Sequence, residues 1–278
     1  MKNILVPTET HDVMASVLET ATLVQRRFNG YVEGFALRPA VPDYVPIDMV
    51  SGLAWHVDEK ADEDTRRSAF ALFEGFMKGR GLPESPAGSP EAGYGWHAKA
   101  PAGDMFLASH GRIFDLVVLG RPVAGKAQPS MASLEAVLFE SGRPLLIAPP
   151  EPPTTLGETV VIAWNGSTET ARTVAFATPF LREAKRIVVL MVEGWSVPGP
   201  SGEQLASSLR RCGLRVETVM ATRDRRNDGE VILARSQALG ADLLVKGAYT
   251  QSRLRQMIFG GATAHILAHS TLPVLMAN

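Results

Sequence analysis

The chain has 278 residues, of which 45% are hydrophobic and 21% charged, and this composition supports folded cores in about two domains rather than a disordered chain. Its 28 basic and 29 acidic residues leave a formal net charge of -1, which argues against binding a nucleic-acid backbone or an anionic membrane. The single cysteine, Cys212, excludes an internal disulfide, and since no base stands near it in sequence we expect an inert thiol rather than a nucleophile.

The amino-terminal residues lack the apolar h-region and the cleavage signature of a secretory signal peptide. The sequence also has no apolar run that approaches the roughly 18 to 20 residues of a membrane helix. We therefore expect a soluble protein of a reducing compartment, and we assign it a cytoplasmic location with neither a nucleic acid nor a membrane as its partner.

Short β-branched runs alternate with longer amphipathic stretches along the chain, which is typical of parallel strands connected by helices. In the first half this pattern predicts strands near residues 3–7, 31–37, 94–97, 116–120 and 144–148. In the second half it predicts strands near residues 159–164, 186–192, 215–220, 243–247 and 273–276.

Two proline-rich segments interrupt the alternation. An insertion at 38–46 follows the second strand and leads into a long helix expected near 58–78; the insertion suits either a simple surface loop or a flap over a cleft or a partner. The second segment, 148–153, lacks backbone donors at its prolines and disfavours helix, so it predicts a stiff connector. We place the domain boundary there, with one domain at 1–150 and the other at 151–278.

Two motifs of the first half recur in the second. Residues 103–108 (GDMFLA) and 115–120 (DLVVLG) reappear as residues 229–234 (GEVILA) and 242–247 (DLLVKG). A repeat that spans about half of the chain indicates two copies of one domain rather than a solenoid of short units.

In an open parallel sheet, ligands bind beyond the carboxyl ends of the strands. The first strand of the second copy is followed there by Trp164, Asn165 and Gly166, where glycine permits a tight turn and Asn165 or Ser167 can cap the next helix. This turn is a candidate part of a binding site.

The fourth strand of the second copy ends at Gly247, and the pair Gly260 and Gly261, followed by Ala262, opens the last helix. Paired glycines at a helix start let backbone amides approach a phosphate, and the helix dipole favours its negative charge. The loop from Gly247 to Ala262 therefore predicts an anion site.

This loop resembles the nucleotide-binding loop of the universal stress protein family, and the resemblance extends over nearly the whole chain as two tandem domains. The family's loop carries Gly, two residues, Gly, nine residues, Gly, then Ser or Thr. In this chain the register is Gly247, two residues, Thr250, nine residues, Gly260 and Gly261, so the second and fourth motif positions differ.

Both differences have physical consequences. A β-branched residue such as Thr250 tolerates a positive φ poorly, so the turn must strain or change shape if relatives use that angle there. Gly261 keeps its amide but lacks the hydroxyl that the family offers to a phosphate. Thr263 is a candidate substitute for that hydroxyl, and Arg253 and Arg255 add positive charge.

The resemblance further implies that the turn after the first strand and the end of the second strand frame the base and the ribose. By position these are Trp164, Asn165, Gly166 and Val192. Asn165 stands where relatives commonly have Asp, so it can hydrogen-bond a ribose or base without charge. Trp164 has two possible roles, stacking on adenine or covering the core at the strand end.

The first copy lacks this loop. Met131 and Ala132 stand opposite Gly260 and Gly261, so the close approach to a phosphate is lost, although Glu9 falls where the family ordinarily has Asp. We expect this copy to be structural, or to bind something other than a triphosphate.

Two other motifs fit simpler explanations. Residues 93–98 match a dinucleotide-binding pattern, but we expect them to form the third strand, because no helix start follows them. His265 and His269 stand one helical turn apart, and we expect a solvated pair rather than a metal site, since no third ligand is evident.

The resemblance implies an α/β fold of two tandem Rossmann-like domains of the adenine nucleotide alpha hydrolase-like type, each with a five-stranded parallel sheet and helices on both faces. Relatives pair through their last strands, which makes residues 145–147 and 274–276 the expected contact between the copies, in a monomer or a homodimer. We expect an adenine nucleotide, ATP or AMP, with or without Mg²⁺, bound by a stress sensor or regulator that is not an enzyme beyond slow ATP turnover. The alternatives are a scaffold or small-ligand binder whose nucleotide sites have decayed, and a nucleotide hydrolase.

Overall fold

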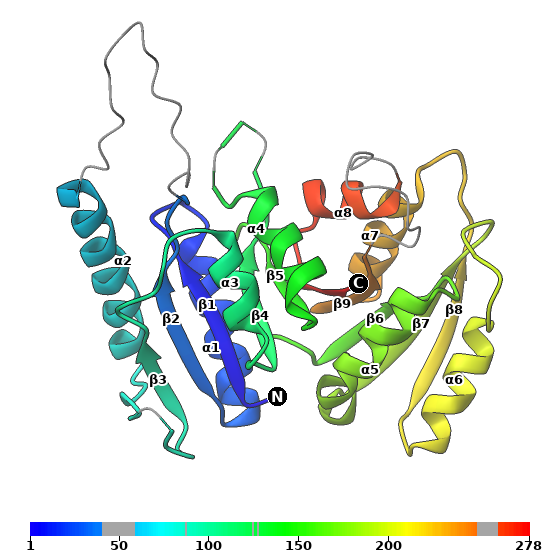
Figure 1. Cartoon of the computed structure of the whole chain (residues 1–278). Coiled ribbons are helices and arrows are strands. Elements are labelled where there is room, and N and C mark those ends of the chain that lie inside the picture. The colour runs from blue at the N-terminus through cyan, green and yellow to red at the C-terminus, as the bar shows by residue number, and fades with distance from the viewer. Residues whose placement is uncertain (41–58, 87, 124, 127, 249–260) are drawn as a thin grey trace, which may run out of the picture.

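The computed structural model describes residues 1–40, 59–86, 88–123, 125–126, 128–248 and 261–278. The described residues form one sheet of ten strands in the order β3-β2-β1-β4-β5-β10-β9-β6-β7-β8 (Figure 1). The strands are β1 Asn3–Thr8, β2 Tyr31–Ala36, β3 Gly93–Trp96, β4 Leu116–Gly120, β5 Leu145–Ala148, β6 Thr159–Ala163, β7 Arg186–Val192, β8 Val216–Ala221, β9 Leu243–Gly247 and β10 Val274–Ala277. Each of the strands expected from the sequence is confirmed, and no end differs by more than one residue.

Helices connect the strands in each half. They are α1 Met14–Phe28, α2 Glu59–Gly79, α3 Asp104–Gly111, α4 Met131–Ala136 with the π-helical turn η1 Val137–Ser141, α5 Thr168–Glu183, α6 Gly202–Arg211, α7 Asp228–Ala238 and α8 Ala262–His269. The long helix expected after the first insertion is thus confirmed as α2, and the strand expected at 93–98 as β3. None of the helices in the described part of the chain combines the length and the hydropathy that crossing a bilayer requires.

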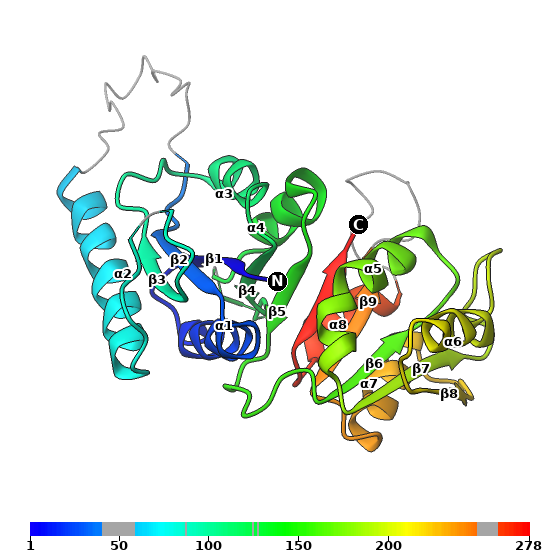
Figure 2. The ribbon, with the colours of Figure 1, turned by 90° about the horizontal axis from the view of Figure 1, so that it is seen from below.

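The two halves repeat one topology. The strand order 3-2-1-4-5 of the first half is mirrored in the second, and the two runs meet where β5 and β10 pair antiparallel, with Ile147 opposite Val274 and Leu146 opposite Leu275. The expected contact between the copies is therefore confirmed. An approximate twofold axis runs along the line of sight in Figure 2, where α1 lies opposite α5 and α2 opposite α6.

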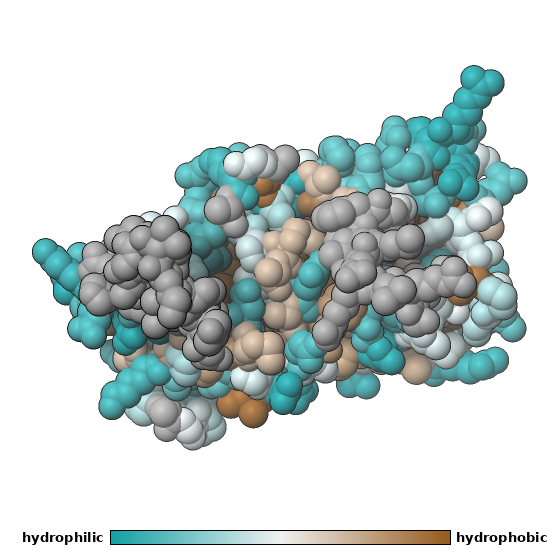
Figure 3. All heavy atoms as spheres, turned by 45° about the horizontal axis from the view of Figure 1, so that its top comes forward, coloured by the Kyte–Doolittle hydropathy of each residue, from teal (hydrophilic) through white to brown (hydrophobic). Residues whose placement is uncertain are grey.

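Both faces of the sheet are covered, which explains why its central strands are apolar without alternation. One core cluster joins α1, α2, α5 and α6 to the sheet. Where α1 and α5 approach each other, the rings of Phe28 and Phe180 meet edge-on with their centroids 5.0 Å apart. The other cluster lies under α3, α4, α7 and α8. Each cluster contains residues of both halves, so the core is continuous across the β5–β10 junction. On the face shown in Figure 3, hydrophilic residues prevail toward the two ends and more apolar ones gather near the middle.

The aspartates of the repeated DL motif have the same role in both halves. Asp115, just before β4, accepts hydrogen bonds from the backbone amides of Lys2 and Asn3 at 2.6 and 3.0 Å. Asp242, just before β9, accepts from the amides of Glu158 and Thr159 at 3.1 and 2.9 Å. Each aspartate satisfies amides at the start of the first strand of its half, which explains why the motif is repeated.

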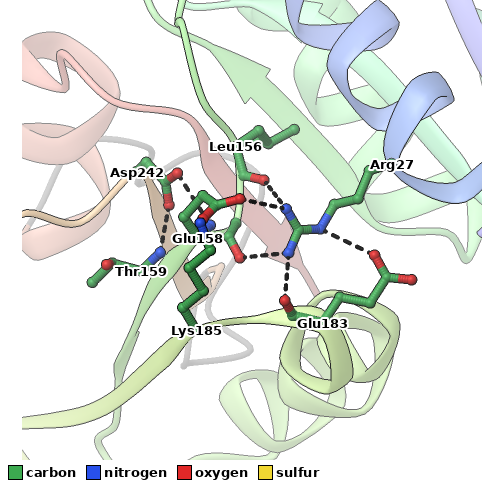
Figure 4. A network of polar contacts seen from close by, with 8 residues as sticks. Arg27, Leu156, Glu158, Thr159, Glu183, Lys185 and Asp242 are labelled. Carbon is green, nitrogen blue, oxygen red and sulfur yellow. Dashed lines mark hydrogen bonds and ion pairs between the residues drawn. The ribbon is translucent and has the colours of Figure 1, made fainter.

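Arg27 of α1 joins the first half to the segment that leads into the second (Figure 4). Its guanidinium donates to the carbonyl oxygens of Leu156, Gly157 and Glu183 at 2.9, 3.0 and 2.8 Å. It also forms ion pairs with the carboxylates of Glu158 and Glu183 at 3.7 and 3.4 Å. Since the Arg27 side chain is mostly buried, these contacts fix the relative position of the two halves.

A second arginine crosses the junction from the loop after β4. Arg121 donates to the carbonyl oxygen of Ala268, at the carboxyl end of α8, and reaches that of Leu267 at 3.5 Å. A cation is favourable at this end of a helix. Besides the strand pairing and the shared core, two arginines thus join the two halves.

Two sequence expectations concern surface features. Cys212 is the C-cap of α6, which confirms its expected place at a helix end, and its thiol is free and exposed. Of the insertion at 38–46, only the first residues are described: Arg38 is buried, pairs with Asp62 of α2 at 2.6 Å and donates to the carbonyl oxygen of Ala100. The choice between a flap and a loop rests on residues 41–46, which lie outside the described residues.

Candidate functional site

The candidate site of the second half lies where β6, β7 and β9 end. β6 pairs with β7 on one side and with β9 on the other, so the ends of these strands lie side by side. This places the turn after β6, Val192 at the end of β7 and Gly247 at the end of β9 on one edge of the sheet. Thr250 and Gly260, which the sequence also assigns to the site, lie outside the described residues.

Gly247 has no room for a side chain. A Cβ atom there would lie 2.4 Å from the backbone nitrogen of Thr170, in the first turn of α5. The glycine therefore lets the end of β9 approach the amino end of α5.

The last helix begins at a glycine that cannot cap it with a side chain. Gly261 is the N-cap of α8, with φ +87° and ψ -158°, a conformation that residues with a side chain rarely adopt. Among the described residues, no atom would lie within 4 Å of a Cβ atom at this position, so what these residues show in favour of glycine is the backbone conformation. The amides of Ala262 and its neighbours at this helix start are groups that can bind an anion.

Lys246 is the feature of this site that the sequence analysis missed. Its side chain is 2% exposed, and its ammonium donates to the Oγ1 of Thr263 at 2.8 Å and to the carbonyl oxygen of Gly247 at 2.7 Å. It also lies 5.8 Å from the centre of the Trp195 ring. A buried cation is thus held at the first turn of α8, close to where the resemblance places phosphate.

Burial lowers the pKa of Lys246 to about 8, because removal from water disfavours the charged form, while the charge of Glu169 in α5 acts in the opposite direction. The sequence signal was available: β9 reads LLVKG, and a lysine in a central parallel strand, buried on both faces, calls for an electrostatic reason. Thr263, considered from sequence as a replacement for the missing hydroxyl, is the residue that Lys246 contacts.

The turn after β6 is built by its own polar side chains. Asn165 is buried, and its Oδ1 accepts hydrogen bonds from the amide of Ser167 at 3.2 Å and the hydroxyl of Thr170 at 2.9 Å. Ser167 in turn caps α5 by accepting from the amide of Thr170. The expected cap is therefore Ser167, and Asn165 shapes the turn that leads into it.

Of the two roles left open for Trp164, the structure places its side chain in the core. Its side chain is 6% exposed, belongs to a core cluster, and donates through Nε1 to the carbonyl oxygen of Pro200 at 2.8 Å. The amide of Val197 donates to the carbonyl oxygen of Asn165 at 3.0 Å. The segment after β7 thus lies over the turn, and a Cβ atom on Gly166 would come within 3.2 Å of the Val197 carbonyl oxygen.

In the first half, the matching helix is capped by a side chain. Ser130 is the N-cap of α4 and accepts from the amide of Ser133 at 3.0 Å, and α4 begins at Met131 without a positive-φ glycine. Nearby, Glu9 is buried after β1, and desolvation, assisted by the charge of Asp104, raises its pKa to about 7. By position Glu9 corresponds to Asn165, so the first half offers a carboxyl group after its first strand where the second half offers an amide.

The two histidines of α8 contact each other and the N-cap residue of α7. The rings of His265 and His269 stack at 4.2 Å, His269 is exposed, and His265 contacts Asn227 at 3.2 Å. The described residues place no third metal ligand with this pair.

Comparison with known proteins gives a family for the second half of the chain. Residues 158–278 match the model of the universal stress protein family. No curated protein matches the chain. A universal stress protein from Archaeoglobus fulgidus is similar in structure, with a TM-score of 0.74 and 16% sequence identity over 99% of this chain and 96% of that chain.

Two solved structures from Pseudomonas aeruginosa are similar at lower TM-scores. A functionally unknown protein gives 0.54, with 14% identity over 100% of this chain and 92% of that chain. A putative universal stress protein gives 0.52, with 14% identity over 100% of this chain and 93% of that chain. At these identities the likeness concerns the fold. The chain therefore carries a universal stress protein domain at residues 158–278, and its first half repeats the fold of that domain in a tandem arrangement.

Proposed function

We propose that the second half binds an adenine nucleotide, ATP or AMP, between the end of β9 and the start of α8, and that the protein acts as a stress-response sensor or regulator. The observation that carries the proposal is the buried ammonium of Lys246 at the first turn of α8. An ammonium and a set of helix amides converge on one place, and both favour a phosphoryl group.

The charge of Lys246 is only partly offset by its neighbours. Within the described residues, the two oxygens that accept its hydrogen bonds are the neutral hydroxyl of Thr263 and the carbonyl of Gly247. Keeping a cation buried with neutral partners is costly, and a bound phosphate would lower that cost through its negative charge. A bound anion would therefore stabilise this site, whereas it would not do so if an apolar residue stood in place of Lys246.

The base needs a different aromatic partner from the one expected. Trp164 is buried in the core, but Trp195 lies half-buried in the segment directly after β7. We assign Trp195, together with the end of β7 at Val192, to the side of the site that receives the base. The Nε1 donor of Trp164 and the carbonyl acceptor of Asn165, on the turn after β6, then serve to hold that segment in place.

Calorimetric titration with ATP, ADP and AMP, each with and without Mg²⁺, tests this function. The wild-type chain is compared with Lys246→Met and with Lys99→Met, an exposed lysine of the first half that serves as the control. We expect nucleotide binding in the wild type and the control, and a loss of affinity of about tenfold or more in Lys246→Met, which corresponds to about 1.4 kcal/mol or more. An absence of heat with every nucleotide at high micromolar concentration, in folded protein, would refute it.

A second function is favoured by one observation. The segment 195–200 covers the turn after β6, and Asn165 is engaged in shaping that turn, as a scaffold with a decayed nucleotide site would also show. Under this alternative the protein acts through partner contacts. This alternative would be favoured if titration with nucleotide produced no binding heat in either lysine variant.

We infer a regulator rather than a dedicated catalyst, with slow ATP turnover as the upper limit of its chemistry. Phosphate release that persists through purification and disappears in Lys246→Met would instead assign a hydrolase. Because β5 and β10 already pair within one chain, a monomer satisfies that contact, and light scattering distinguishes it from a homodimer. We retain the cytoplasm as the proposed location.

A further inference from the structure

Three potential metal ligands gather at the β2–β3 edge of the first half, far along the sheet from the ends of β6, β7 and β9. They are Glu33 on β2, His97 directly after β3 and His110 on α3. One ligand atom from each residue lies within 4.8 Å of the other two, and all three residues are half-buried. Neither the nucleotide proposal nor the packing of the core requires two imidazoles and a carboxylate here.

The fold brings the three residues together from distant positions. β2 and β3 pair in parallel with Glu33 beside Gly95, and the amide of His97 donates to the carbonyl oxygen of Gly34 at 2.8 Å, which fixes the chain after β3. Helix α3 crosses this edge and presents His110, whose Nε2 lies 2.7 Å from Oε1 of Glu33. The rings of His97 and His110 are 5.0 Å apart.

We propose that Glu33, His97 and His110 form a binding site for a transition-metal ion, with zinc as the ion that this donor set fits. Imidazole nitrogen and carboxylate oxygen are ordinary zinc ligands, and three protein ligands leave a fourth position for water. Half-burial leaves that position reachable from solvent.

The spacing of the ligand atoms is compatible with zinc. Ligand bonds of roughly 2.0 to 2.2 Å in a tetrahedral arrangement put neighbouring ligand atoms about 3.3 Å apart. The distance between His110 and Glu33, 2.7 Å, must open slightly, and the widest separation, at most 4.8 Å, must close. Both changes are small enough that we expect side-chain rotations to make them.

A supporting contact orients the carboxylate. The hydroxyl of Tyr31 donates to Oε2 of Glu33 at 3.3 Å, which leaves Oε1 directed at His110. Gly95 makes room for this arrangement, because a Cβ atom there would lie 2.1 Å from the Tyr31 oxygen. Such contacts behind the ligands are typical of zinc sites.

The aromatic surroundings restrict the two imidazoles further. The ring of Phe106 stacks on the rings of His110 and His97, with centroid distances of 5.0 and 5.6 Å. Phe35 meets Phe106 edge-on, with the ring centroids 5.2 Å apart. Preorganised rings lose little conformational entropy when a metal binds. The competing explanation is a hydrogen-bonded pair of His110 and Glu33 without a metal. That explanation does not account for the position of His97 beside them.

The test is a zinc titration of the full chain with its purification tag removed, in competition with a chromophoric chelator. We expect about one tightly bound zinc ion per chain, and at least about tenfold weaker binding in each of His97→Ala, His110→Ala and Glu33→Gln. The control is the double variant His265→Ala and His269→Ala, which removes the other histidine pair of the chain and is expected to bind as the wild type does.

Two further measurements keep the outcome clear. Circular dichroism tests whether each variant is folded. If an alanine variant is unfolded, Glu33→Gln takes its place, since its amide preserves the shape of the side chain. Visible absorption of bound Co²⁺ reports coordination by these ligands and is expected to disappear in His97→Ala. Wild-type chains that bind no zinc, or zinc binding lost only in the His265 and His269 variant, would overturn the proposal. Both results are independent of nucleotide binding by the second half.

Discussion

The ammonium nitrogen of Lys246 lies 2.8 Å from Oγ1 of Thr263, so the end of β9 and the first turn of α8 are joined through a buried cation. The sheet supplies the cation and the helix supplies the hydroxyl and the amides. Binding of an anion at this junction and the stability of the fold are therefore linked through one side chain.

Replacement of this cation is expected to stabilise the fold while it weakens nucleotide binding. The folded pKa of Lys246, about 8, lies below its ordinary value of 10.5, so the unfolded chain binds more protons between these pH values. The free energy of unfolding therefore rises with pH across this window, and below pH 8 the buried charge destabilises the fold by roughly 3 kcal/mol.

Chemical denaturation of Lys246→Met measures this effect. At pH 7 we expect the variant to be more stable than the wild type by roughly 1 to 3 kcal/mol, since its lost hydrogen bonds offset part of the gain. The difference is expected to shrink as the pH approaches 10. Lys99→Met is the control, and a variant less stable than the wild type at pH 7 would contradict the argument.

Glu9 gives the opposite pH dependence in the first half. Its folded pKa of about 7 exceeds the ordinary 4.5, so the folded chain binds more protons between these values and stability falls as the pH rises through the window. Glu9→Gln is expected to raise the free energy of unfolding by up to roughly 3 kcal/mol above pH 7 and to change little near pH 4.5. Denaturation at both pH values measures it, with the exposed Glu151→Gln as the control. Equal effects of Glu9→Gln at both pH values would count against this account.

Arg27 is expected to hold the two halves together. Arg27→Ala removes three hydrogen bonds to carbonyl oxygens and two ion pairs, which we expect to cost roughly 2 to 4 kcal/mol of stability. Urea unfolding followed by tryptophan fluorescence and by circular dichroism is then expected to show transitions that no longer coincide. The control is Arg182→Ala, an exposed arginine of α5. A single coincident transition with unchanged midpoint would show that strand pairing suffices.

Gly261 is expected to matter for the nucleotide through its backbone conformation. Gly261→Ala is expected to cost about 1 to 3 kcal/mol of strain at φ +87°, or to rearrange the start of α8, and in both cases to weaken nucleotide binding. The matched control is Gly213→Ala, which also has a positive φ, +81°, and open space around its Cβ position, but lies at the end of α6. Calorimetry should show reduced nucleotide affinity only for Gly261→Ala, and equal affinity in the two variants would argue against an amide site.

The strands were predictable because buried parallel strands are short apolar runs bounded by glycine, proline and polar residues. The run Leu116–Gly120 illustrates this, since all its residues are buried and both of its ends were predicted. The same pattern correctly predicted β9 as a buried core strand, but it gave no role to the lysine within that strand, Lys246. A pattern of hydropathy reports burial and does not report which polar group a buried cation meets.

The candidate site was predictable in its glycines and not in its side chains. Gly247 and Gly261 carry a local signal, because backbone conformation and close approach restrict the residue at one position. The burial of Trp164 depends on the segment that ends at Pro200, which no local pattern around residue 164 indicates.

By itself the sequence determined the duplicated α/β architecture, the strand positions and the glycine-bounded loop, because periodicity and backbone preference act over a few neighbouring residues. Only the tertiary structure decided that Lys246 faces Thr263, that Trp164 belongs to the core, and that His110 meets Glu33 across 77 positions of the chain. Such pairs depend on how strands and helices pack, since contact energies fall off within a few ångströms in space regardless of separation along the chain.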